Sequence, residues 1–266
     1  MYMKRFLLIA GLCAIFLLLL FSYTTGAKDD LKIETRYHVN QDLSLSVISG
    51  DFDDVDVSAW KKVINILPKD LLKQHVVELH AFSDGVDGTL AFVEANDTDE
   101  SRWTFAIDYE DAVDTESDDF ISTVIHEFAH ILSLSPNQIQ QIYDSCDSYE
   151  IEEGCAKEGS YINGFYKTFW QGDLSSEHKN LIDGLEGDDK EAIIADFFDA
   201  HSESFVNEYA ATNPPEDFAE SFMFFVLSEK INNPISMKEK KQNFFYNYPK
   251  LAEIRDTIRA NTRVRK

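Results

Sequence analysis

Residues 118–132 read Asp-Asp-Phe-Ile-Ser-Thr-Val-Ile-His-Glu-Phe-Ala-His-Ile-Leu, the most apolar helical pattern after residue 27. Its apolar residues recur at helical spacing along one broad face. The two aspartates at its start suit the positive end of a helix dipole, and Thr115 or Ser117 could cap it. The pattern predicts a helix whose apolar face lies in the core.

Strand-like segments precede this helix, and helical segments follow it. One possible strand lies at 43–48, and strands are predicted at 76–82, 89–94 and 103–109, each of these three bounded by Gly, Asp or Asn. A helix over 60–77 is interrupted at Pro68. Residues 137–185 look irregular with short helical patches, and further helices are predicted at 191–205, 215–227 and 249–265. The expected fold class is α+β, a small twisted sheet packed on the 118–132 helix plus a mostly helical C-terminal lobe.

The helix contains His126-Glu127-Phe128-Ala129-His130, an H-E-x-x-H motif. Positions i and i+4 lie one turn apart on the same helix face, so both imidazoles can reach one ion. Zn²⁺ suits neutral imidazole and keeps a coordination position open for water in catalytic sites. Glu127 would lie beside that water and accept its proton. Without a metal ion, two histidines and a glutamate in so apolar a helix would be costly to bury.

Three glutamates could supply a third ligand. Glu150 lies twenty residues after His130, in an acidic segment without a following apolar helix face. Glu216 and Glu220 lie one turn apart on the predicted 215–227 helix, where an unpartnered carboxylate at Glu220 would be expensive. Glu216 also fits the third position of a helix capped by Asn213. The residues by themselves leave the choice open.

The run Glu216-Asp217-Phe218-Ala219-Glu220, with Tyr209 seven residues before Glu216, is similar to a known pattern. Together with H-E-x-x-H it resembles the lethal-factor-like zinc metallopeptidases, a group that includes the Pro-Pro endopeptidases. The resemblance covers the His126 helix and residues 208–226, with nothing comparable in 28–110. It implies a zincin-like, gluzincin-type domain with one zinc ion per chain on His126, His130 and Glu216. It also implies that Tyr209 stabilises the oxyanion and that Glu220 supports a ligand without touching the metal.

The N-terminus predicts a location for the protein. Lys4 and Arg5 precede an apolar run over 6–21, and small residues follow at Thr25 and Ala27. We expect residues 1–27 to be a signal peptide or signal anchor, with 6–23 as a possible membrane tether. The protein would then be extracytoplasmic, either secreted or membrane-anchored. Residues 28–266 would form one domain, with a sheet and active-site helix lobe over 28–136 and a helical lobe over 137–266.

Cys146 and Cys155 are the cysteines that remain after this leader. A pair nine residues apart in an exported chain predicts a small disulfide loop. The arginines at 255, 259 and 263 follow one side of the last predicted helix, where we expect a solvated face.

The charge and the motifs limit the partners. A formal net charge of −24 repels phosphate backbones, so nucleic acid is not an expected partner. The expected activity is that of a monomeric zinc endopeptidase acting on peptides or proteins, with an edge strand at 103–109 that pairs with the substrate. The competing hypothesis is a non-catalytic exported binding protein that retains a zinc-peptidase scaffold.

Overall fold

The strands of the N-terminal half pair into one sheet. The computed structural model describes residues 32–84, 88–114, 118–140, 145–151 and 154–262. Within them a five-stranded sheet has the order β2-β1-β3-β5-β4. Its strands are β1 (Lys32–Val39), β2 (Leu45–Ser49), β3 (Val76–Ser83), β4 (Ala91–Ala95) and β5 (Trp103–Asp108). β1 was not predicted, because charged and polar residues interrupt its sequence and only alternate residues of its second half are buried.

The sheet is mixed, and its edge next to the 118–132 helix is β4. β3 and β5 pair in parallel, whereas β1–β2, β1–β3 and β4–β5 are antiparallel. The prediction that 103–109 forms the edge strand is wrong, because β5 lies between β3 and β4. β4 and β5 are consecutive antiparallel strands. The turn between them is held by Asn96, whose side chain accepts hydrogen bonds from the backbone of Thr98 and Asp99.

Four helices accompany the sheet: α1 (Asp54–Ile66), α2 (Lys69–His75), α3 (Tyr109–Asp114) and α4 (Asp118–Leu134). Asp53 caps α1 by accepting a hydrogen bond from the Val55 N–H, and Pro68 separates α1 from α2 as predicted. The buried ring of Trp60 on α1 lies 6.3 Å from that of Phe105 on β5. The proposed α4 caps, Thr115 and Ser117, lie outside the described residues.

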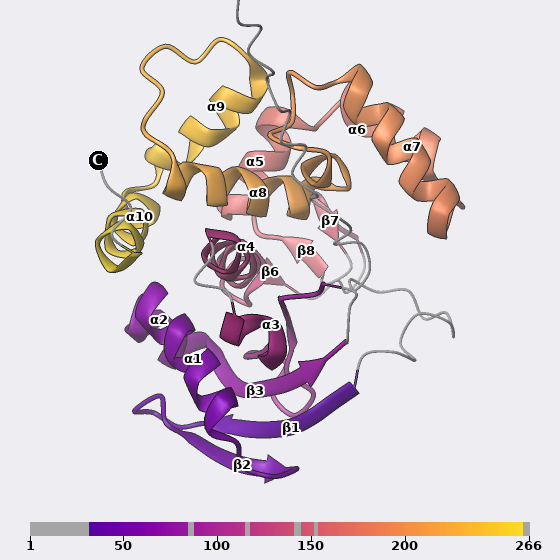
Figure 1. Cartoon of the computed structure of the whole chain (residues 1–266). Coiled ribbons are helices and arrows are strands. Elements are labelled where there is room, and N and C mark those ends of the chain that lie inside the picture. The colour runs from indigo at the N-terminus through magenta and orange to yellow at the C-terminus, as the bar shows by residue number, and fades with distance from the viewer. Residues whose placement is uncertain (1–31, 85–87, 115–117, 141–144, 152–153, 263–266) are drawn as a thin grey trace, which may run out of the picture.

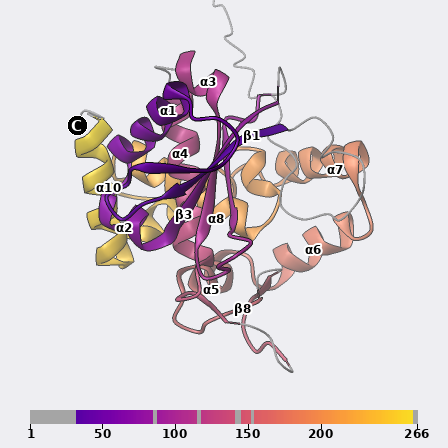
Figure 2. The same ribbon diagram turned by 90° about the horizontal axis from the view of Figure 1, so that it is seen from below.

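The C-terminal half is mostly helical, and α8 lies at its centre. It comprises a small sheet of β6 (Ile139–Gln140), β8 (Gly154–Ala156) and β7 (Glu150–Ile151), followed by α5 (Tyr161–Phe169), α6 (Asp173–Ile182), α7 (Gly187–Ala200), η1 (Tyr209–Ala211), α8 (Pro214–Leu227), α9 (Met237–Phe244), η2 (Phe245–Asn247) and α10 (Pro249–Thr262). Figure 1 shows α4 between the sheet and α8. Figure 2, from below, shows α8 and α4 behind the sheet strands and α6 and α7 projecting to one side.

Phenylalanines supply much of the packing around α8. Phe218 and Phe222 are fully buried, and their rings lie 5.1 and 5.3 Å from that of Phe245. Phe165 on α5 lies 5.5 Å from Phe218. The aromatic cluster holds α8 from the side opposite α4, so that one helix carries both a packing face and a polar face.

The arginines of α10 do not form a solvated face. Arg255 and Arg259 are each 8% exposed. Arg255 donates to the carbonyls of Phe225 and Ser228, and Arg259 to those of Val226, Leu227 and Ser228. These are the last carbonyls of α8, which have no partner within the helix. The guanidinium groups therefore stabilise the negative end of α8. Arg263 lies outside the described residues.

The predicted α+β fold class is confirmed, whereas the prediction of a membrane-anchored location is contradicted within the described residues. No helix among them is long and apolar enough to cross a membrane. α4, with 17 residues, is shorter than the roughly 20 that a span needs. The leader at 1–27 and the tether at 6–23, on which the prediction of a secreted or anchored protein depended, lie outside the described residues.

Candidate metal centre

His126 and His130 project from the same face of α4, as their spacing predicts. Both are buried, with 6% and 4% of their surface exposed. Their Nε2 atoms lie 3.0 Å apart, and their rings meet edge to face with centroids 4.8 Å apart. The two imidazole nitrogens could therefore supply two of the three protein ligands of a metal site.

Glu216 completes this group from the first turn of α8. Asn213 caps α8 by accepting a hydrogen bond from the Glu216 N–H, and proline occupies the start of the helix. The buried carboxylate oxygen Oε2 of Glu216 lies 3.1 Å from His126 Nε2 and 3.3 Å from His130 Nε2. The capping and the ligand interpretations of Glu216 are thus compatible, because its backbone N–H serves one and its side chain the other.

The three ligand atoms fit a metal ion. Zinc bonds of about 2.0–2.1 Å in a tetrahedral arrangement separate neighbouring ligand atoms by roughly 3.3–3.4 Å. The three distances observed, 3.0, 3.1 and 3.3 Å, are close to this value. Although Glu216 Oε2 is buried, it has no partner with hydrogen-bond geometry among the described residues. His126, His130 and Glu216 therefore form a buried group that could bind a metal ion.

Glu220, one turn further along α8, contacts the His126 ring nitrogen that faces away from Glu216. Its Oε1 lies 2.7 Å from His126 Nδ1, and its Oε2 accepts a 2.5 Å hydrogen bond from Asn207 Nδ2. A hydrogen bond at Nδ1 fixes the ring so that Nε2 faces the metal position. Asn207 also accepts from the Ala210 N–H and so joins η1 to α8. The role of Asn207 was not predicted, because no local pattern shows which amide reaches a distant carboxylate.

Electrostatics tie these side chains together. Burial opposes ionisation of Glu216, but the imidazoles of His130 and His126 outweigh burial and lower its pKa. Burial likewise disfavours a charged His126, but Glu216 and Glu220 outweigh it and raise the pKa of His126 well above the usual value. A metal at this site would therefore have to displace a proton, as is usual for imidazole ligands.

Glu127 lies next to the ligands and contacts the edge strand. It is 6% exposed, and burial raises its pKa to about 7. Its Oε2 accepts a 3.1 Å hydrogen bond from the backbone N–H of Val93 on β4. The ladder bonds of Leu90 and Asn96 with β5 imply that residues 91, 93 and 95 direct their backbone groups to the open side. The contact with Val93 was not predicted, because a backbone N–H has no sequence signature.

The ring of Tyr209 packs beside the ring of His126. It lies on η1, and its ring centroid is 5.5 Å from that of His126. Burial of the hydroxyl, followed by the nearby charges of Glu216, Glu127 and Glu220, raises the pKa of Tyr209 well above its usual range. The phenol therefore keeps its proton at neutral pH and is a hydrogen-bond donor.

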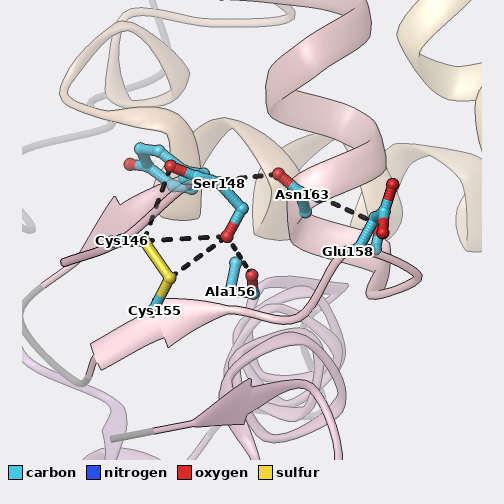
Figure 3. The surroundings of a disulfide bond; sticks show 7 residues. Cys146, Ser148, Cys155, Ala156, Glu158 and Asn163 are labelled. Atoms are coloured by element: carbon cyan, nitrogen blue, oxygen red, sulfur yellow. Dashed lines mark hydrogen bonds between the residues drawn. A yellow bond between two sulfur atoms is a disulfide. The ribbon is translucent and has the colours of Figure 1, made fainter. Parts of the chain in front are cut away.

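The remaining predicted residues lie elsewhere. Glu150 is exposed on β7, outside the His126–His130–Glu216 group. Cys146 and Cys155 form the predicted disulfide, with a Cα–Cα distance of 5.5 Å. Figure 3 shows the disulfide beside Ser148, which contacts both sulfurs. The disulfide is compatible with an extracytoplasmic location.

Comparisons with known proteins add nothing to this geometry. No protein-family model matches the chain, and no curated protein and no solved structure matches it either. The resemblance to lethal-factor-like zinc metallopeptidases is therefore an interpretation of the two motifs and of the group that they form.

Proposed function

We propose that this protein is a zinc-dependent endopeptidase of the zincin type, with one zinc ion held by His126, His130 and Glu216. The convergence of two imidazole nitrogens and one carboxylate oxygen within 3.3 Å of one another carries the proposal. When bound, zinc supplies a Lewis acid that polarises a carbonyl and lowers the pKa of water. The donor set, two nitrogens and one oxygen, is one that catalytic zinc sites use.

Glu127 and Tyr209 would perform the proton and charge chemistry. Glu127 is next to His126 in sequence and is buried, so it could accept a proton from the attacking water and return it to the leaving amine. Tyr209, whose ring lies tilted beside that of His126, would donate its phenolic hydrogen to the carbonyl oxygen as negative charge develops there. Asn207 and Glu220 would keep His126 in its orientation.

The substrate would be an extended peptide that pairs with the open side of β4. Val93 contacts Glu127, so a peptide aligned along residues 91–95 would pass the proposed base. Main-chain pairing with an edge strand accepts many side chains, and pockets beside the strand would then set the preference. In this proposal β4, and not the strand at 103–109, pairs with the substrate.

The test combines metal analysis with cleavage. The purified chain should contain one zinc ion and cleave a peptide library, whereas Glu127→Gln should keep the zinc and the fold and lose nearly all turnover. Glu127→Gln is a matched control, because it preserves shape and removes only the base.

Two results would contradict the proposal. A folded wild-type chain that binds no zinc would remove the metal centre. A zinc-loaded wild-type chain as inactive as Glu127→Gln on the whole library would favour the binding-protein hypothesis instead.

A further inference from the structure

A buried ion pair lies directly behind the ligand Glu216. Asp217, the next residue of α8, is 0% exposed, and its Oδ2 lies 2.6 Å from Nζ of Lys241 on α9. Trp170 Nε1 donates to the same oxygen at 2.7 Å, and Ser221 Oγ donates to Oδ1 at 3.2 Å. Neighbouring residues on a helix point in directions about 100° apart. Glu216 therefore faces α4, while Asp217 is held from another side.

Lys241 is fully enclosed. Its side chain is 0% exposed, and Nζ lies 4.0 Å from the ring centroid of Phe205 and 5.7 Å from that of Trp170. α9 is itself fixed at its start, where Ser236 and Glu239 form a capping box. A lysine on an otherwise polar helix thus reaches into the aromatic core to meet one carboxylate.

Stability does not account for such a pair. Taking two charges out of water costs several kcal/mol per ion, and apolar replacements of similar volume are often neutral or stabilising. What a buried ion pair can provide is a unique geometry. Here the pair fixes the position of the first turn of α8, which carries Glu216.

We propose that Lys241 and Asp217 are positioning residues that fix the rotation of α8 about its axis, so that the Glu216 carboxylate meets His126 and His130. A carboxylate about 6 Å from the helix axis moves by roughly 2 Å when the helix rolls by about 20°. Such a displacement would break the close grouping of ligand atoms. The arginine contacts of α10 hold the C-terminal end of α8, whereas the Asp217–Lys241 pair holds its first turn, which carries Glu216. The inference rests on the proposed metal centre.

The decisive variant is Asp217→Asn/Lys241→Met, which removes both charges at nearly constant volume. We expect the metal-free thermal midpoint to stay within a few degrees of the wild type. Zinc affinity, measured by competition with a chromophoric chelator, should fall about 10–100-fold, the usual loss for a residue that orients a ligand. At saturating zinc, kcat should fall while KM stays constant. Lys240→Met, at an exposed neighbour on α9, is the matched control and should match the wild type.

A folded double variant with wild-type zinc affinity and kcat would overturn the inference. If the double variant does not fold, Asp217→Asn decides, because it keeps the side-chain shape and the hydrogen bond from Trp170 and removes the charge that pairs with Lys241. It should weaken zinc binding several-fold, and an unchanged affinity would also overturn the inference. Failure of the proposed function is distinguishable, because the wild-type chain would then bind no zinc or cleave no peptide.

Discussion

At the scale of single residues, Glu216 and Glu220 lie one turn apart on α8 yet contact different atoms of His126. Glu216 Oε2 faces Nε2, and Glu220 Oε1 faces Nδ1. Glu216→Gln should therefore abolish zinc binding, whereas Glu220→Gln should weaken it about 10–100-fold. Titration of metal-free protein with zinc measures both. Loss of binding in Glu220→Gln with intact binding in Glu216→Gln would reverse the assignment.

Tyr209 gives a prediction about the reaction alone. Tyr209→Phe keeps the ring near His126 and deletes only the hydroxyl. Because the donated hydrogen bond would strengthen as the carbonyl oxygen becomes negative, kcat should fall roughly 10²–10³-fold. KM, zinc content and thermal midpoint should stay at wild-type values, and steady-state kinetics with a cleaved peptide measures the difference. Wild-type kcat in this variant would make Tyr209 a packing residue.

At the scale of elements, the contact between β4 and α4 aligns the edge strand with the proposed base. Val93→Pro deletes the N–H that donates to Glu127 Oε2, and it spares the pairing with β5 because this N–H faces the open side. A hydrogen bond to a charged group contributes about 1.5–3 kcal/mol, so kcat/KM should fall roughly 10–100-fold. Val93→Ala, which keeps the N–H, is the control. Equal activity in the two variants would exclude a role for this contact.

At the scale of the whole molecule, the candidate ligands join the two halves of the chain. His126 and His130 come from α4, which packs beside the sheet, and Glu216 comes from α8 in the helical half. The unfolded chain does not bring them together, so zinc should bind only the folded state. Zinc at 100 times its dissociation constant should then stabilise the fold by about 2.7 kcal/mol.

For a domain of this size that stabilisation corresponds to a rise of roughly 5–10 °C in thermal midpoint. A chelator should remove the increase, and His130→Ala should show none. Scanning calorimetry with and without zinc measures the shift. An equal zinc-dependent shift in His130→Ala would mean that the ion stabilises the protein at another place.

Features that depend on residues close together in the chain could be predicted from the sequence. Histidines four positions apart on an apolar helix had to share a face, and Asn213 before Pro214 had to begin a helix. The Cys146–Cys155 loop was short enough for its disulfide to be predicted from spacing. The α+β class followed from strand-like segments that precede helical ones.

Features that join distant segments became visible only in the folded structure. It made β4 the edge strand, placed Glu220 behind His126, brought Val93 to Glu127 and enclosed Lys241 beside Asp217. It also turned Arg255 and Arg259 from an expected solvated face into partners of the last α8 carbonyls. Hydropathy patterns indicate which face of a helix or strand is buried, but they do not indicate which element packs against that face. Which charged group meets which partner is set by how whole elements pack, and that depends on residues far apart in the chain.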